Sequence, residues 1–338
     1  MIAFGIHFGY FTIRVSKCFK RRGRDKLQFR QVTRPDYGAV DWWPNYQGAF
    51  PNIFDPDTET VGYEALKQVG ELNLQRMCRF DTQFFKQLLD TEQENHPNIT
   101  IWKRFLSTLR QDYIRDTDQP RIGLHLEGVF LAKKKSSWMP WLFEKDRSFK
   151  LVERLRTLGR YLDFEDITLV RERQLIERYV ARQSNLSVGE LLLTIGGERS
   201  SVWLVVDSNS GKVQSLQTCP GIDNLVAHIN NKKSPDVLMA LISCLNQGNC
   251  KDVTQLEPAL EDWRKNGLRP ALYQARKVTE NASFGEKTSR QDPRVIGEGA
   301  HLLIRVKQKK SLAPESHYWQ ANTAAEIVLT KDGQEGRK

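Results

Sequence analysis

The sequence lacks the features that mark membrane proteins and several large enzyme classes. No apolar run in its 338 residues approaches the ~20 residues that cross a bilayer, so we expect no transmembrane segment. The apolar start of the chain has no basic residue before it and is interrupted by His7, which favours a strand over a secretory signal peptide. The sequence also has no P-loop, H-E-x-x-H, G-x-S-x-G or cysteine-rich zinc motif.

Cysteine is scarce, and the cysteines are scattered. There are five, an odd number, and none has the spacing of a metal site. They are Cys18, Cys78, Cys219, Cys244 and Cys250. The sequence therefore predicts buried or idle thiols in a reducing compartment, and hence a cytoplasmic protein.

The composition is that of a globular protein with an excess of basic residues. Hydrophobic residues make up 39% and charged residues 27%, which excludes collagenous, wholly disordered and coiled-coil chains. Lysine and arginine number 51 against 41 acidic residues, a formal net charge of +10. A charge of this size raises nucleic acid or an anionic surface as a partner, but it does not bear on the fold.

Hydrophobic periodicity predicts alternating strands and helices. A hairpin over residues 2–18 turns at Gly9-Tyr10, helices follow within 63–113, and a strand begins at Ile122. A helix over 172–182 precedes three strands within 190–218, with a turn at Gly196-Gly197. Helices over 222–265 and strands over 301–306 and 325–330 complete the expected α/β order.

Five stretches in this order resemble the nucleotide-binding domain of the DnaK-type (seventy-kilodalton heat-shock) chaperones, within the actin-like ATPases. The segment from Gly5 to Gly9 is similar to the first phosphate loop, and Leu193 to Val202 to the second. Val61 to Gln68 resembles the start of the helix that carries a catalytic lysine, here Lys67. Two further stretches, 122–130 and 164–181, fall where the family has V-T-V-P-A-x-F and the E-P-T-A-A helix.

The resemblance implies a two-lobed actin/DnaK-type ATPase fold with a shortened second lobe. The expected divisions are residues 1–185 for the first lobe, 186–290 for the second and 291–338 for a C-terminal segment with strands and a charged tail. Residues 295–330 are either a remnant of the adenosine loop or a fragment of the substrate-binding β domain. The implied ligands are ATP or ADP, and the implied partner is a protein client or co-chaperone. The implied nucleotide-binding positions are Gly5, His7, Gly9, Tyr10, Lys67, Gly196, Gly197 and Arg199.

The sequence departs from the family where hydrolysis needs acids. His7 stands at the aspartate of the first loop, and Thr194 and Ser201 stand at the aspartates of the second. The glutamate of E-P falls at Arg171 or, with a one-residue shift, at Glu172. Mg²⁺ prefers oxygen ligands, so a neutral imidazole holds it poorly. We therefore expect hydrolysis to be weak or absent and Mg²⁺ not to bind, although the resemblance leaves open whether the chain is an enzyme.

Other bulky or charged residues replace small ones in the two loops. Tyr10 and Phe11 stand at the two threonines of the first loop and would crowd phosphates. In the second loop Glu198 stands at the third glycine and Arg199 at the threonine. Two plainer interpretations stay open: His7 as a buried or turn-capping histidine, and Gly196-Gly197 as an ordinary tight turn.

The alternative function is a basic protein that binds nucleic acid or an anionic surface. It would use three basic segments, Lys20 to Lys26, Lys133 to Trp141 and Lys307 to Lys310. Ordinary solvated loops explain the same segments. Separately, His125 and Glu127 share one face of a strand and could begin a metal site, but no third ligand is evident.

Overall fold

The described residues form two compact units. The computed structural model describes residues 2–20, 27–32, 49–69, 78–91, 96–114, 120–126, 150–159, 166–183, 185–231, 235–247, 253–281, 293–297, 299–300, 302 and 319–335. The first unit comprises Met1–Arg171 and Gln320–Lys338, and the second comprises Glu172–Trp319. The C-terminal segment therefore belongs with the N-terminal unit, although the whole second unit separates the two in the chain.

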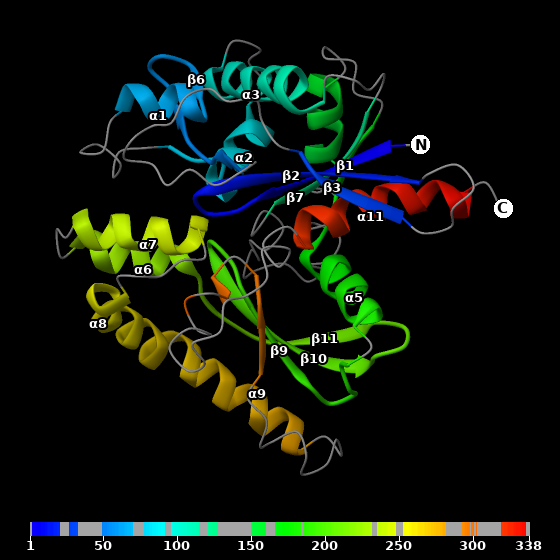
Figure 1. Ribbon diagram of the computed structural model, residues 1–338, viewed down its shortest axis with the longest axis vertical. Coiled ribbons are helices and arrows are strands. Elements are labelled where there is room, and N and C mark those ends of the chain that lie inside the picture. The colour runs from blue at the N-terminus through cyan, green and yellow to red at the C-terminus, as the bar shows by residue number, and fades with distance from the viewer. Residues whose placement is uncertain are drawn as a thin grey trace. The chain divides into compact units, whose positions relative to one another are not determined.

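The first unit is built on a mixed sheet whose described strands run in the order β3-β2-β1-β7-β8, with β4 paired to β2 (Figure 1). The first three strands are antiparallel neighbours, whereas β7 runs parallel to β1 and β8 parallel to β7. The strands are β1 (Ile2–Phe8), β2 (Thr12–Lys20), β3 (Leu27–Gln31), β4 (Ala49–Pro51), β7 (Arg121–Leu126) and β8 (Asp166–Leu169). A separate antiparallel pair, β5 (Phe54–Asp55) and β6 (Thr60–Val61), follows β4 in the chain.

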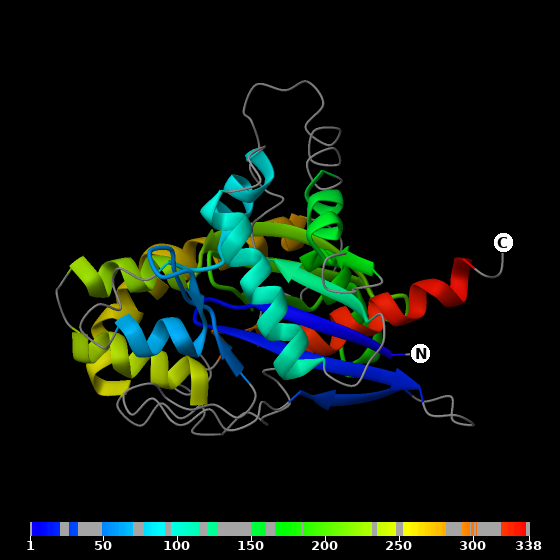
Figure 2. The same ribbon diagram turned by 90° about the horizontal axis from the view of Figure 1, so that it is seen from above.

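Both faces of β1 are buried, each against a different partner. Side chains alternate along a strand, so Phe4, Ile6 and Phe8 point to one face. That face joins an aromatic core that includes Trp102 and Phe105. These two residues belong to α3 (Pro97–Tyr113), which crosses over the strands in Figure 2. Helices α1 (Tyr63–Val69) and α2 (Thr82–Asp90) belong to the same unit, and so does a helix over residues 150–159, whose leucines join this core.

Helix α11 (Trp319–Glu335) packs against the opposite face of the same sheet, and two glycines let it approach closely (Figure 1). A Cβ atom at Gly5 would lie 1.8 Å from the Ala321 carbonyl oxygen, and one at Gly123 would lie 2.5 Å from the Ala324 oxygen. Ser16 also donates a hydrogen bond to the Asn322 side chain. The strand face under α11 is thus as dry as the face under α3.

The sheet of the second unit repeats the same arrangement. Its order is β11-β10-β9-β12, in which the first three strands in the chain are antiparallel neighbours and β12 runs parallel to β9. The strands are β9 (Leu191–Ile195), β10 (Arg199–Asp207), β11 (Lys212–Pro220) and β12 (Arg294–Ile296). Helix α5 (Glu172–Arg182) packs on these strands through Ile176 and Val180.

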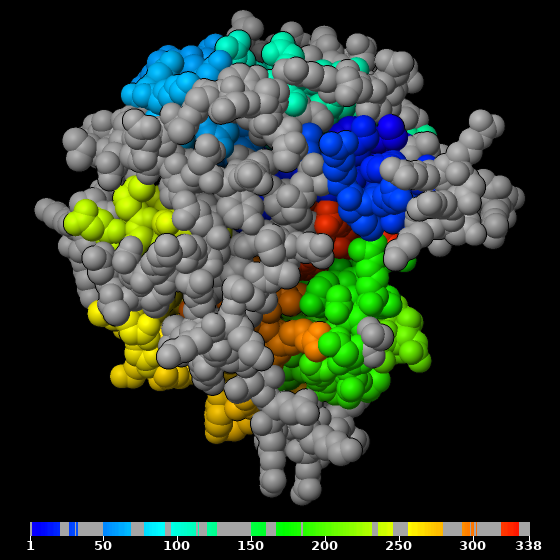
Figure 3. All heavy atoms as spheres, in the orientation of Figure 1, coloured from blue at the N-terminus to red at the C-terminus, as the bar shows by residue number. Residues whose placement is uncertain are grey.

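The remaining helices of the second unit lie between β11 and β12 in the chain. They are α6 (Ile222–Asn231), α7 (Pro235–Gln247), α8 (Val253–Trp263) and α9 (Arg269–Asn281). A π-helical turn, η2 (Arg264–Leu268), joins α8 to α9. In the space-filling view atoms of α8 and α9 reach the surface in yellow to amber, and atoms of β2 and β3 reach it in blue (Figure 3).

The structure confirms the α/β class and corrects two expectations. The strand expected over 325–330 is wrong, because these residues belong to α11. Cys18, Cys78 and Cys219 carry free thiols, but Cys244 is disulfide-bonded, so the prediction of thiols throughout is wrong at Cys244. Within the part of the chain that the structure describes, no helix has the length and apolar character to cross a bilayer.

Candidate functional site

The turn after β1, expected to be a first phosphate loop, is closed by its own hydrogen bonds. The Gly9 N–H donates to the Thr12 carbonyl oxygen at 2.9 Å, and the Gly9 carbonyl accepts from Asn52 Nδ2 at 2.6 Å. The Asn52 N–H donates in turn to the Phe11 carbonyl at 2.9 Å. The backbone donor of Gly9, which an anion would need, is therefore already used within the protein.

Two aromatic rings and a guanidinium fill the same turn. Tyr10 and Phe11 are buried and meet edge to face, with ring centroids 4.7 Å apart. The Arg79 guanidinium lies over the Tyr10 ring, 3.9 Å from its centroid. This is the geometry of a cation–π contact. The rings therefore pack as core residues.

His7 lies inside β1 and pairs with a second histidine. It is directly opposite His125 on β7 and Arg14 on β2. The Nδ1 atoms of the two histidines are 2.8 Å apart, and the rings stack with centroids 5.0 Å apart. Burial lowers the pKa of His125 to about 3. Burial, together with His125 and Arg14, also holds the pKa of His7 well below its ordinary value. Both rings are thus neutral at neutral pH, and His7 is a buried residue that does not cap the turn.

Arg14 is the residue that sequence reasoning missed. It is 1% exposed and lies on β2 between Thr12 and Ser16, on the face that also carries His7. Its Nε and Nη1 atoms have no hydrogen-bond partner among the described residues. The same holds in the described chain for His7 Nε2, His125 Nε2 and Thr12 Oγ1.

The second glycine turn, Gly196-Gly197, is tied to the start of α6. The Ile222 N–H donates to the Gly196 carbonyl at 3.1 Å, and the Asp223 N–H donates to the Gly197 carbonyl at 2.8 Å. The Gly221 N–H donates to the Glu198 carbonyl at 3.3 Å. The turn thus caps two of the amides at the N-terminus of α6 that would otherwise be open to an anion.

Beside this turn lies one carboxylate, Glu172, at the start of α5. Thr194 Oγ1 donates to its Oε1 at 2.8 Å and accepts from Trp203 Nε1 at 3.3 Å. Burial raises the pKa of Glu172, and the Thr194 hydrogen bond and the Arg199 charge offset part of that effect. Of the two positions expected for the E-P glutamate, Glu172 is therefore the one next to the second loop. Ser201 is buried, and its Oγ has no partner in the described part of the chain.

These residues do not fit a hydrated Mg²⁺ ion. The ion prefers oxygen ligands, mostly carboxylates and water. The three aspartate positions hold His7, Thr194 and Ser201, and the first two are engaged with neighbouring side chains. No group of three or more histidine, cysteine, aspartate or glutamate side chains placed to hold a metal occurs in the described residues. His125 contacts His7, whereas Glu127 lies outside those residues.

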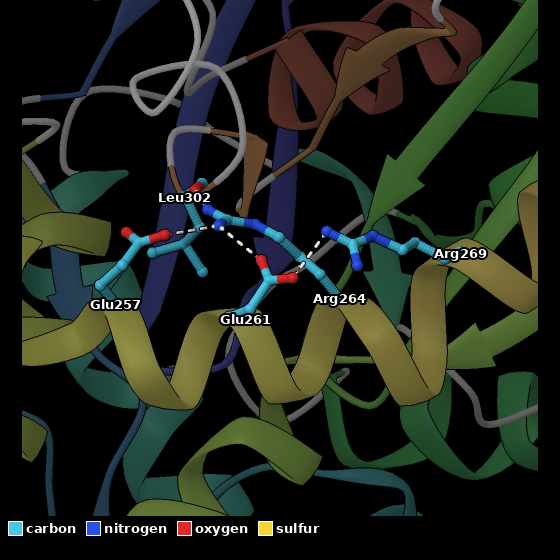
Figure 4. A network of polar contacts seen from close by, with 5 residues as sticks. All are labelled: Glu257, Glu261, Arg264, Arg269 and Leu302. Atoms are coloured by element: carbon cyan, nitrogen blue, oxygen red, sulfur yellow. Dashed lines mark hydrogen bonds and ion pairs between the residues drawn. The ribbon is translucent and has the colours of Figure 1, made fainter.

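A further glycine-containing segment of the second unit follows β12. Gly297 has a φ of +100°, and Gly299 donates its N–H to the Ile195 carbonyl at 3.2 Å. Arg264 of η2 holds this segment, donating to the Leu302 carbonyl at 3.1 Å and to Glu257 at 2.9 Å (Figure 4). The Arg269–Glu261 pair flanks it at 2.6 Å. Of residues 295–330, the described positions just after β12 thus form a glycine-containing segment held by Arg264 of η2, and residues 319–330 belong to α11.

The predicted site residues divide between the two units. Lys67 is exposed on α1, and Gly5 is explained by the approach of α11. The first unit holds Gly5, His7, Gly9, Tyr10 and Lys67, and the second holds Gly196, Gly197 and Arg199. Of the three basic segments, Lys20 ends β2, and the remaining residues lie outside the described part of the chain: Arg21 to Lys26, Lys133 to Trp141 and Lys307 to Lys310.

Comparison with models of known protein families finds no match to this chain, and neither does comparison with curated proteins.

Proposed function

We propose that the chain is a divergent actin/DnaK-type protein that acts as a nucleotide-binding or interaction module without Mg²⁺-dependent ATP hydrolysis. Each unit has a sheet in which three antiparallel neighbours are followed by a strand parallel to the first of them in the chain, and this shared pattern supports a two-lobed fold. The glycine-containing segment after β12 lies at the carboxyl end of a strand parallel to β9, where ligands of open α/β sheets bind. This position favours the adenosine-loop interpretation of residues 295–300.

One observation carries the loss of hydrolysis: neutral side chains with internal partners stand at acidic positions. His7 shares a hydrogen bond with His125, and Thr194 bridges Glu172 and Trp203. Phosphoryl transfer depends on a metal ion and on a group that positions the attacking water. Glu172 alone cannot supply both, because a single carboxylate with a raised pKa is a weak metal ligand.

The partner implied by the resemblance is a protein client or co-chaperone, in the cytoplasm. Disulfides are rare in reducing compartments, so the bond at Cys244 argues against a cytoplasmic location. The redox state of Cys244 in the cell therefore tests this location. Mass spectrometry of protein alkylated in cell lysate would show the state of Cys244.

Thermal unfolding with nucleotide tests the proposed function. The full chain is melted with ATP or ADP, once with MgCl₂ and once with EDTA. A ligand that binds only the folded state raises the melting temperature. We expect any rise to be the same in both buffers. A rise that requires Mg²⁺ would contradict the proposal. No rise in either buffer would exclude nucleotide binding and reduce the proposal to an interaction module.

A further inference from the structure

The paired strands β2 and β3 leave the core of the first unit at one end. Residues 12–16 of β2 are buried, whereas Lys17 is half-buried and Lys20, at the end of the strand, is exposed. On β3, Phe29 is 37% exposed and Arg30 is exposed as well. Among the described strands β3 pairs with β2 alone, so it forms an edge of the sheet. The basic end of β2–β3, defined by these last four residues, therefore presents its side chains at the surface (Figure 3).

Positive charge is concentrated at the basic end. Neither strand contains an aspartate or a glutamate along its length. Lys17 and Arg30 are directly opposite each other in the register. Like charges in this position destabilise a sheet, so an anion close to both would relieve the repulsion. In the sequence, residues 21–26 add four cations and one acid between the two strands. The charge here therefore favours a polyanion as the partner.

The cations lie on both faces of the two strands. Side chains alternate across a strand, so Lys17 and Arg30 share one face. Lys20 lies on the other face, where Phe29 is its diagonal neighbour on β3. A flat anionic bilayer would meet only one of these faces, and residues 21–26 include no apolar side chain that would enter it. A flexible polyanion, in contrast, can contact both faces around the edge that β3 forms.

The exposed ring of Phe29 favours nucleic acid over an acidic peptide. Bases of a single strand stack on aromatic rings while neighbouring cations hold the phosphates, and every base has a face that can stack. Aspartate and glutamate side chains have no such face. In a duplex the bases are already stacked on one another. The ring of Phe29 beside Lys20 therefore suits a single strand best.

We propose that the basic end of β2–β3 binds single-stranded nucleic acid without sequence preference. Phe29 stacks on a base, and Lys17, Lys20 and Arg30 contact phosphates. The contact needs no metal ion. It goes beyond the proposed function, because these residues are not among the expected nucleotide-binding positions and either activity can exist without the other.

Fluorescence anisotropy of the full chain in EDTA tests the surface. The probes are labelled oligothymidylate and oligouridylate of about 20 nucleotides, and a DNA duplex of the same length. We expect the single strands to bind more tightly than the duplex, and their affinity to fall steeply between about 50 and about 200 mM salt. Tighter binding of oligouridylate would identify RNA as the partner, and tighter binding of oligothymidylate would identify DNA.

Two variants separate the phosphate contacts from the stacking. Lys17→Gln/Arg30→Gln should weaken single-strand binding about 10-fold or more and reduce its log–log salt slope by about 1 for each cation removed. Phe29→Leu should weaken single-strand binding about 10-fold and duplex binding by less than about 2-fold. If the double variant does not fold, Phe29→Leu alone decides, because its loss must be confined to single strands.

Arg173→Gln/Lys212→Gln is the matched control, since it removes one exposed arginine and one exposed lysine from the second unit. We expect it to bind the oligonucleotides as the wild type does. Four results would overturn the proposal: no single-strand binding at the lowest salt, an equal loss in the control, polyglutamate binding as tight as that of the oligonucleotides, or a Phe29→Leu loss that is the same for duplex and single strands.

Discussion

His7 Nδ1 lies 2.8 Å from His125 Nδ1, although 118 residues separate the two in the chain. The contact follows from register, since β1 and β7 are parallel and place the two residues directly opposite each other. It fixes one proton between the rings and occupies the Nδ1 atom of His7. A position where the resemblance would put a metal-binding aspartate thus holds a neutral ring that is bonded internally.

This pair makes stability depend on pH. In the unfolded chain each histidine protonates near its ordinary pKa, whereas the pKa of His125 in the folded chain is about 3 and that of His7 is also lowered. The unfolded state then binds more protons at acidic pH. The free energy of unfolding should therefore fall as pH drops below about 6.5, by up to about 1.4 kcal/mol per pH unit for each histidine. For His125 the loss should end near pH 3.

Urea unfolding between pH 7.5 and pH 4.5 measures this slope. His125→Leu removes one titrating histidine, so the free energy of unfolding should change less steeply with pH in this variant, whatever its absolute stability. An unchanged slope in this variant would show that His125 does not titrate as its burial implies.

The rings of the first turn should behave as core residues. Phe11→Ala should lower the free energy of unfolding by about 3 kcal/mol, because it deletes a buried ring. Arg79→Gln should cost about 1 kcal/mol or less, the worth of a cation–π contact near the surface. Urea unfolding of both variants checks the ranking, and a Phe11→Ala protein as stable as the wild type would refute the packing.

Glu172 should be replaceable with a gain in stability at neutral pH. Its pKa is raised in the folded state, so the folded chain holds the proton longer and stability falls as pH rises through that range. Glu172→Gln keeps an oxygen that accepts from Thr194 and removes the charge of this partly buried carboxyl group. We expect its unfolding midpoint to exceed that of the wild type at pH 7.5 and to approach it near pH 4.

Glu177→Gln is the control for this prediction, since Glu177 lies on the same helix in an exposed pair with Arg173. It should change stability by less than about 0.5 kcal/mol at either pH. A Glu172→Gln protein that is less stable than the wild type at pH 7.5 would show that Arg199 outweighs the burial.

Gly5→Ala should dislodge α11. The added Cβ would lie 1.8 Å from a backbone oxygen of the helix, which cannot move without shifting the helix itself. We expect a loss of about 3 kcal/mol or more in thermal or urea unfolding. Gly267→Ala is the matched control, because its nearest neighbour would be at 3.5 Å, an ordinary contact. Equal stability of the two variants would argue against the packing of α11 on β1.

Alternation and helical periodicity predicted most elements, including the opening hairpin and the three strands that became β9 to β11. They failed at residues 325–330, where a run of β-branched and apolar residues suggested a strand. The reason is tertiary, because Ala321, Ala324 and Ala325 offer small side chains to the glycines of the sheet and so favour a closely packed helix.

Arg14 was overlooked for a related reason. It lies between Ile13 and Val15, and strict alternation places such a residue on a solvent face. Because α11 covers that face, β2 is buried on both sides along Thr12–Val15. The pairing of His7 with His125 likewise depends on β1 and β7 being neighbours, which no local sequence pattern predicts.

ATP turnover by the purified chain tests the central claim most directly. Phosphate release is followed with saturating ATP and MgCl₂, with an EDTA sample and a Thr194→Val variant beside it. The account predicts that release in MgCl₂ does not exceed that in EDTA and that Thr194→Val changes nothing. Sustained release that requires Mg²⁺ and falls in Thr194→Val would contradict it.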